Sequence, residues 1–307
     1  MATVLDAWKV YRELVLDTRS TRERKSTEGR WAQHLGPAFA SITLGKVNTL
    51  RVLRFRRGLE EKALSPQTVQ HCLALLRRIL RKALRLGLYA GRLPYFDMPR
   101  FDNRRQRFLS PDEARHLLGF LRNASPLWHE ISLFALQTGL RAGEIFQLTR
   151  EQVSFHSQHI TVFDSKNNMS RHVPLNATAQ AILLRRLPED PAGLFFTSNG
   201  RPIREAGTVF RRIVGRSGIN RGVNDRRVKV VFHTFRHTFA SWLVQAGTPL
   251  AVVSTLLGHK TVIMTQRYAH LAPDQARQAV RSLPILHAEG VGEGKRDKNN
   301  SSKYWRN

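Results

Sequence analysis

The sequence is poor in cysteine and in acidic residues, and both shortages narrow what the protein can be. Its 307 residues include one cysteine, Cys72, which excludes an intramolecular disulfide and a cysteine-rich zinc site. Because Cys72 stands among leucines, we expect a buried structural thiol rather than a reactive one. Only 23 Asp and Glu oppose 50 Lys and Arg, which leaves a formal net charge of +27. Such a charge favours a polyanion partner, with nucleic acid ahead of an anionic membrane surface.

Long apolar runs and a nucleotide-binding loop are also missing. No run approaches the roughly 18 apolar residues of a membrane helix, and the start MATVLDAWKVYREL lacks the basic-then-apolar pattern of a signal peptide. We therefore expect a cytoplasmic protein without a membrane partner. The C-terminal GVGEGKRD superficially resembles a P-loop, but no strand precedes it and no Ser or Thr follows its lysine.

Hydrophobic spacing predicts that residues 1–100 form an all-helical domain. One amphipathic pattern includes Leu5 and Trp8, and a shorter one covers residues 47–57. A third begins at Ser65-Pro66 and reaches about residue 87, with leucines repeating along one face.

A row of basic residues lies on another face of that third predicted helix. Arg78, Arg81, Lys82 and Arg85 follow at offsets of three, four and seven positions, so they share one side of the helix. A solvated charged face is the ordinary interpretation. Because the row contains no acid to pair with, we favour a face that follows DNA phosphates.

The pattern changes after residue 90. The turn-rich segment 91–107 has no periodicity, and we place a basic interdomain linker at 101–108, where Arg104, Arg105 and Arg107 could reach phosphates. Ser110 then opens a helix with a capping signature, and a core helix follows and ends near residue 139.

The extended segments 159–163 and 171–175 flank the turn DSKNNMS and predict a β-hairpin with Lys166 at its tip. Most such lysines are simply solvated. After about residue 285 the chain is polar, and we expect a disordered tail over 285–307.

The pentapeptide HTFRH gathers cations at one predicted helix start. Arg236 and His237 come three and four residues after His233, and Thr234 is a plausible N-cap for this helix. Positive groups at a helix N-terminus are costly unless something negative sits there, since that end already favours anions. This arrangement is the first indication of a phosphate.

Two further short helices are predicted downstream. Gly258 closes the first of them just before His259, and Thr261 can start the second, which carries Tyr268. A tyrosine on an apolar helix is ordinarily a core residue, so its place after LGH is what favours a chemical role.

Together these motifs resemble the tyrosine recombinase (phage integrase) family. HTFRH, then LGH, then a tyrosine nine residues after that histidine follow the family pattern, and TGLRAGEIFQL resembles its first arginine motif. The resemblance covers about residues 105–275. The family order Arg, Lys, His-x-x-Arg, His, Tyr is met by Arg141, Lys166, His233, Arg236, His259 and Tyr268.

The resemblance implies a mainly α fold with a small antiparallel β-sheet. Residues 1–100 would form a helical core-binding domain that clamps DNA, and residues 109–284 the catalytic domain. The implied activity is site-specific recombination of double-stranded DNA through a 3′-phosphotyrosine intermediate, for integration, excision or resolution. The implied assembly is a tetramer on DNA, and the DNA-free protein could be a monomer.

Transfer of a phosphodiester to tyrosine requires charge stabilisation and two proton transfers. Arg141 and Arg236 would clamp the phosphate, because a planar guanidinium gives bidentate contacts and stays charged. Tyr268 would be the nucleophile and His233 its base. Lys166 would protonate the leaving oxygen.

The remaining candidates have supporting roles. His259 would hydrogen-bond a phosphate oxygen, and Glu144 would orient the region of the first arginine. For His237 we favour packing against or supporting the site, with a direct role as the weaker alternative. Many relatives carry Asp where this chain has Thr234, and that difference could change the pKa of His233.

Such chemistry requires no cofactor, metal or ATP. The two histidines of HTFRH have the i, i+4 spacing of a zinc helix, but an arginine lies between them and no catalytic glutamate accompanies them. Two alternatives remain at this point: a type IB topoisomerase, which relaxes supercoils without strand exchange, and a catalytically silent DNA-binding protein of the same fold.

Overall fold

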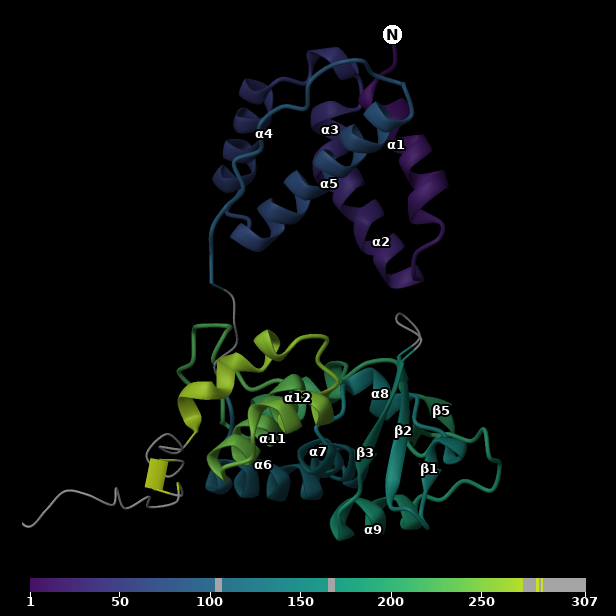
Figure 1. Cartoon of the computed structure of the whole chain (residues 1–307), viewed down its shortest axis with the longest axis vertical. Helices are drawn as coiled ribbons and strands as arrows, with labels where there is room; N and C mark the ends of the chain where they lie inside the picture. The colour runs from purple at the N-terminus through teal and green to yellow at the C-terminus, as the bar shows by residue number, and fades with distance from the viewer. Residues whose placement is uncertain (103–106, 165–168, 273–279, 282, 284–307) are drawn as a thin grey trace, which may run out of the picture. The chain divides into compact units, whose positions relative to one another are not determined.

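The chain forms two compact units, Met1–Arg105 and Gln106–Asn307. The computed structural model describes residues 1–102, 107–164, 169–272, 280–281 and 283 (Figure 1). The boundary between the units falls inside the 101–108 segment that we assigned to the linker. Within these described ranges, no helix has the length and apolar character needed to cross a membrane.

The first unit is helical and has its own core. Trp8 and Trp31 stack with ring centroids 4.6 Å apart, and the longest helix, α5, packs against α1. Its elements are α1 (Val4–Tyr11), the π-helical turn η1 (Arg12–Leu16), α2 (Thr21–Arg30), the π-helical turn η2 (Trp31–Leu35), α3 (Gly36–Phe39), the 3₁₀ turn η3 (Leu44–Lys46), α4 (Thr49–Glu61) and α5 (Pro66–Arg85).

Helix α5 begins and ends close to where the sequence predicts. The Ser65 hydroxyl accepts a hydrogen bond from the backbone N–H of Thr68, and Pro66 occupies the first helical position, where its missing N–H costs nothing. Leu73, Leu76 and Leu80 lie on its buried face. The predicted hydrophobic spacing and cap are therefore both confirmed.

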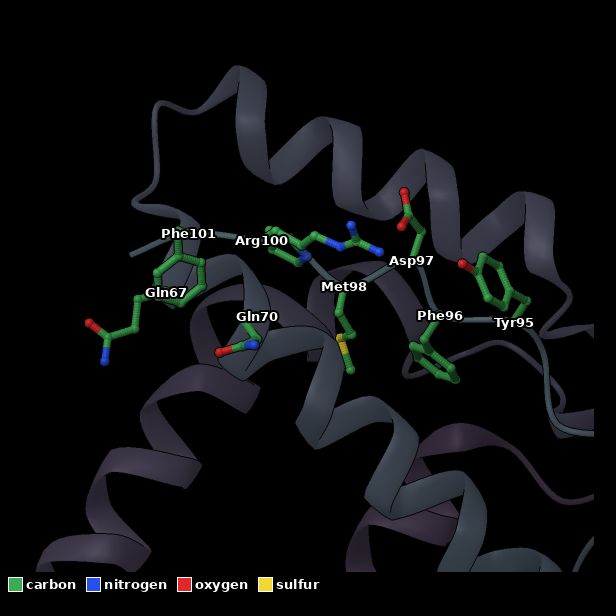
Figure 2. A pocket seen from close by; sticks show the side chains of 9 residues that line it. Gln67, Gln70, Tyr95, Phe96, Asp97, Met98, Arg100 and Phe101 are labelled. Carbon is green, nitrogen blue, oxygen red and sulfur yellow. The ribbon is translucent and has the colours of Figure 1, made fainter. Parts of the chain in front are cut away.

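The segment after α5, which has no helical periodicity in the sequence, packs on the core of the first unit at least as far as Met98. Phe96 is buried, and Leu93 and Met98 pack against the core of the first unit. Asp97 instead forms an ion pair with Arg56 of α4. Figure 2 shows this alternation, with Phe96 and Met98 on one side of the segment and Asp97 on the other. An extended segment with period-two alternation can be half-buried without any helical periodicity, which explains why the sequence pattern missed it.

A pocket of about 670 Å³ opens between this segment and the start of α5 (Figure 2). Its lining includes Gln67 and Gln70 of α5 and residues 95–101. None of the candidate catalytic residues that the structure describes is part of this lining.

The second unit combines helices with two small antiparallel sheets. Its elements are α6 (Pro111–Ala124), α7 (Pro126–Thr138), α8 (Ala142–Phe146), the 3₁₀ turn η4 (Arg150–Gln152), β1 (Val153–Ser154), β2 (His159–Asp164), β3 (Met169–Pro174), α9 (Ala177–Arg185), β4 (Thr197–Ser198), β5 (Arg201–Pro202), α10 (Thr208–Arg216), α11 (His233–Gln245), α12 (Leu250–Leu257) and the 3₁₀ turns η5 (Val262–Met264) and η6 (Gln266–Leu271).

The predicted hairpin is present as β2 and β3, and β1 extends it to a three-stranded sheet in the order β1-β2-β3. Ile160 pairs with Val173 across the hairpin, and both side chains are buried in the main core of the unit. That core also contains Phe134 of α7 and Phe235 of α11, so the hairpin and the central helices are packed on one another.

Two local predictions are wrong. Helix α11 already starts at His233, so Thr234 is not its N-cap; the Thr234 hydroxyl instead accepts from the backbone N–H of Val231 and closes the preceding turn. The segment from Thr261 forms two 3₁₀ turns rather than an α-helix, and the N–H of Tyr268 donates to the carbonyl of Thr265. The β-branched run in TVIMT disfavours a regular helix there.

Candidate active site

The candidate site lies where α11 meets α12 and the turns that follow. Figure 1 draws these two helices next to each other within the second unit, beside α7. Val244 of α11, Val253 and Leu257 of α12 and Tyr268 form a small separate core. This core fixes the distance between the helix that carries Arg236 and the turn that carries Tyr268.

Arg236 is a buried cation on α11, with 4% of its surface exposed. Its Nη1 donates to the carbonyl of Gly139 at 2.7 Å, and its Nη2 donates to the carbonyl of Leu257. Burial and the positive charges of Arg141 and Arg171 lower the pKa of Arg236 to about 9, although Glu144 opposes the shift. The guanidinium is therefore still charged at neutral pH, but its charge is poorly compensated.

Arg141 stands just before α8, where its backbone and side chain both engage Glu144. The Arg141 Nη1 and the Glu144 carboxylate are 2.8 Å apart, and the Arg141 backbone N–H donates to the other carboxylate oxygen at 2.8 Å. The Arg141 Nη2 donates to the carbonyl of Gly258 at 3.0 Å. Arg141 and Arg236 thus bind the carbonyls of two consecutive residues at the end of α12.

A third arginine, Arg171 of β3, belongs to the same cluster, and our sequence analysis missed it. Its Nη1 and Nη2 donate to the two oxygens of Glu144 at 3.1 and 2.7 Å. Burial alone would raise the pKa of Glu144, but the hydrogen bonds and charge of Arg171, together with those of Arg141, hold it below its usual value. The strand alternation could have indicated that Arg171 faces the interior, because it shares one strand face with the buried Val173.

Tyr268 is almost buried, and its hydroxyl contacts His237. The phenol oxygen lies 2.5 Å from Nδ1 of His237, whose ring packs edge-on against that of His233, with centroids 4.7 Å apart. Burial raises the pKa of Tyr268, although Arg267 and Arg236 act in the opposite direction. The phenol is therefore protonated at neutral pH and placed next to a group that can accept its proton.

This geometry differs from the roles that we assigned to the two histidines. His233, which we expected to act on the phenol, is exposed at the start of α11, whereas His237 makes the hydrogen bond. His237, one helical turn after His233, points towards Tyr268. The spacing of HTFRH does not indicate which of the two histidines faces the tyrosine.

His259 follows Gly258 directly and is held by a hydrogen bond between its Nδ1 and the Thr265 hydroxyl, at 2.8 Å. Burial, followed by the charges of Arg236 and Arg141, lowers the pKa of His259 to about 4. The imidazole is therefore neutral at neutral pH in this state. An anion bound beside these arginines would reduce the free-energy cost of protonating His259.

The remaining predicted residues fall outside the described part of the chain or belong to other elements. Lys166, Arg104 and Arg105 fall outside the described residues, as does the predicted tail 285–307. Arg107 forms an ion pair with Glu113. In the first unit, the row on α5 reaches solvent: Arg78, Arg81 and Arg85 are exposed, and Lys82 is half-buried.

The cluster has the chemistry of an anion site. Two guanidinium groups share Glu144, and a third, Arg236, is bound to carbonyl oxygens, so positive charge exceeds negative charge in the part of the cluster that the structure describes. Planar guanidinium groups favour phosphate oxygens as ligands. No group of three or more His, Cys, Asp or Glu residues suited to a metal occurs among the described residues.

Comparisons with known proteins agree with this chemistry. Residues 107–275, more than half of the chain, match the model of the phage integrase family. The chain is 29% identical over 314 residues to an integrase of Salmonella phage P22, covering 92% of this chain and 79% of that one. It is 30% identical over 236 residues to an integrase of Escherichia phage 186, covering 76% and 65%.

Solved structures show the same fold at low sequence identity. The integrase of transposon Tn1549, in complex with transposon right end DNA, matches with a TM-score of 0.72 and 20% identity over 91% of this chain and 99% of that one. A lambda integrase dimer bound to a COC′ core site matches with a TM-score of 0.70 and 15% identity over 87% and 95%. The mainly α fold with a small antiparallel sheet is thereby confirmed, and a type IB topoisomerase is not favoured. The chain belongs to the phage integrase family and is a site-specific tyrosine recombinase, an enzyme that cleaves and rejoins DNA.

Proposed function

We propose that Tyr268 attacks a DNA phosphodiester within a specific recombination site and forms a transient 3′-phosphotyrosine link, without ATP or a metal ion. The observation that carries this proposal is the position of the Tyr268 hydroxyl, 2.5 Å from a histidine nitrogen, on a turn packed against the helix that bears Arg236. The phosphodiester energy stays in the protein–DNA bond, so rejoining requires no further energy source.

The three-arginine cluster supports binding of the reacting phosphate. Arg141 and Arg236 each present a guanidinium group anchored by one or two backbone carbonyls, which keeps its remaining N–H donors in place. Charge that develops on the nonbridging oxygens would be stabilised by these donors, and one such donor contributes on the order of 3 kcal/mol to a transition state. His259, next to the Gly258 carbonyl that binds Arg141, would donate to a phosphate oxygen.

The proton of the phenol would pass to Nδ1 of His237 as the phenol oxygen bonds to phosphorus. The bond between phosphorus and the 5′ oxygen breaks at the same time, and that oxygen gains a proton, in our proposal from Lys166. His233, whose exposed ring packs edge-on against that of the buried His237, would assist by connecting His237 with solvent. This assigns to His237 the role that the motif alone suggested for His233.

The DNA itself would be held by both units. We propose the basic face of α5, with Arg78, Arg81, Lys82 and Arg85, as the phosphate-contacting surface of a core-binding domain, and we assign further phosphate contacts to Arg104 and Arg105. A lambda integrase tetramer bound to a Holliday junction has the same fold, with a TM-score of 0.70. By that analogy we infer four protomers acting on two DNA sites.

A nicked suicide substrate tests the chemistry. After cleavage, the short 5′-hydroxyl fragment diffuses away, so a covalent protein–DNA adduct accumulates and can be measured by denaturing electrophoresis. Wild type should form the adduct in the presence of a chelator, and Tyr268→Phe should form none. If both trap the same amount of DNA, Tyr268 is not the nucleophile and the chain is a DNA-binding protein that retains the fold.

The same assay separates the two histidines. His237→Gln should lower the single-turnover rate of adduct formation by about 100-fold or more, within the range expected for a lost general base, and His233→Gln should have the smaller effect. A larger loss in His233→Gln would return the role of base to His233.

A further inference from the structure

Three consecutive carbonyls at the end of α12 each accept a hydrogen bond from a different arginine. The Leu256 carbonyl accepts from Nε of Arg171 at 3.3 Å, the Leu257 carbonyl from Nη2 of Arg236, and the Gly258 carbonyl from Nη2 of Arg141 at 3.0 Å. The last carbonyls of a helix lack intrahelical partners and form the negative end of its dipole. The end of α12 therefore binds three arginine side chains, one at each of three consecutive carbonyls.

Arg171 differs from the other two arginines in how it is held. Its side chain is 12% exposed and binds both oxygens of Glu144. Glu144 in turn binds the backbone and the Nη1 of Arg141. Arg171 therefore holds the carboxylate that orients Arg141 and, through Leu256, the helix end that binds Arg141 from the other side.

The backbone of Gly258 and the side chain of Arg171 are closely packed at the end of α12. Gly258 has a φ of +62°, which favours glycine, and a Cβ atom there would also lie 2.8 Å from Cδ, Nε and Nη1 of Arg171. Because the guanidinium group is fixed by Glu144 and by Leu256, it cannot move aside without losing those bonds. The absence of a side chain at residue 258 makes room for the arginine.

We propose that Arg171 is a positioning residue for DNA cleavage, which acts by fixing Glu144 and the end of α12 so that Arg141 meets the scissile phosphate. Arg171 itself does not touch the DNA. A lysine could keep the charge but could not bind two carboxylate oxygens and a carbonyl in one plane. This inference rests on the proposed function, because it assumes that Arg141 binds the reacting phosphate.

The experiment measures single-turnover adduct formation on the nicked substrate at saturating DNA, together with DNA affinity, for Arg171→Lys and Arg171→Gln. A displacement of about 1 Å at a reacting group can cost about 100-fold in rate. We expect the cleavage rate to fall between about 10-fold and 100-fold in both variants, with affinity changed by less than about 2-fold. Thermal unfolding identifies any variant that does not fold, and Gly258→Ala, whose Cβ would collide with Cδ, Nε and Nη1 of Arg171, should show the same pattern.

A double-variant series distinguishes positioning from a purely structural ion pair. In an Arg141→Lys background, Arg171→Gln should cause almost no further loss, because the residue that it positions is already gone. Arg186→Lys is the control, since Arg186 also pairs with a half-buried carboxylate, that of Glu130, elsewhere in this unit; its side chain is 24% exposed, against 12% for Arg171. It should retain the wild-type rate.

The outcomes separate this inference from the proposed function. If wild type forms no Tyr268-dependent adduct, the proposed function fails and the inference fails with it. If wild type cleaves and Arg171→Gln cleaves equally fast, the inference alone is overturned. Additive losses in the Arg141→Lys background, or an equal loss in Arg186→Lys, would also overturn it.

Discussion

At the residue scale, the ionisable groups of the DNA-free site are held in an electrostatically unfavourable environment, because cations lie close together around the buried Arg236 and Glu144 offsets only part of their charge. Arg236 is buried among other cations, and His259 is neutral beside them. Both conditions raise the free energy of the DNA-free site. A phosphate placed between these groups would lower it, which makes the site selective for an anion rather than a neutral ligand.

His259 gives this cluster a predictable pH dependence. Its pKa in the folded protein is about 4, below the unfolded value of about 6.5, so the unfolded chain binds the proton more readily. The free energy of unfolding should therefore fall as pH drops from about 6.5 to about 4, and this contribution should be constant above and below that window. Burial also lowers the pKa values of His71 and His129, which act in the same direction.

Chemical denaturation at a series of pH values measures this slope. His259→Asn can keep a hydrogen bond to Thr265 but cannot bind the proton, so its stability should depend less steeply on pH between about 4 and 6.5. The same slope in both proteins would show that His259 does not titrate as the structure implies.

At the element scale, the turn between α7 and α8 supports the site through its backbone. Gly139 ends α7 with a φ of +64°, and a Cβ there would lie 2.3 Å from Cδ1 of Phe239. Its carbonyl accepts the Nη1 of Arg236. Gly139 is therefore required both by its own conformation and by the helix packed over it.

Gly139→Ala should lower the free energy of unfolding by more than the roughly 1–2 kcal/mol of a left-handed alanine, because the Phe239 ring must also move. It should reduce adduct formation as well, since Arg236 would lose its carbonyl. Gly119→Ala is the matched control: α6 leaves open space at that position, so stability should stay the same or rise by about 0.4–1 kcal/mol. Equal stabilities of the two variants would contradict the packing described for α7 and α11.

Local sequence patterns were most reliable for elements that carry their own caps. The capping box of Ser110 and Glu113 at the start of α6 is present as predicted, and so is the left-handed Gly258 at the end of α12. The segment around Tyr268 was harder to predict because its 3₁₀ turns are held by packing on α11 rather than by local preference. Hydrophobic spacing registers burial, but it does not distinguish a helix from two successive turns.

At the scale of the whole molecule, the net charge of +27 should make DNA binding strongly dependent on salt. The logarithm of the affinity should fall with a slope of about −0.9 per phosphate neutralised. Removing Arg81 and Arg85 together, as glutamines, should make that slope less steep by up to about 1.8 if both contact phosphates. Fluorescence anisotropy over a range of salt concentrations measures this directly.

A second pair of exposed arginines in the same unit provides the control. Arg12→Gln with Arg19→Gln removes the same charge from exposed positions outside α5, so it should change the slope less if the face of α5 is the one that meets DNA. Equal changes in the two double variants would mean that only the net charge matters, and α5 would lose its assigned role.

The sequence by itself determined the chemistry of this protein and most of its helix boundaries, because motifs, caps and hydrophobic spacing act between residues close together in the chain. Only the tertiary structure decided which side chains meet. Arg141 and Gly258 are 117 positions apart, and Arg171 and Leu256 are 85 apart, so no local pattern relates them. His237 rather than His233 contacts Tyr268 for the same reason: the choice depends on how α11 is rotated against η6, and that rotation is set by packing across the whole catalytic unit.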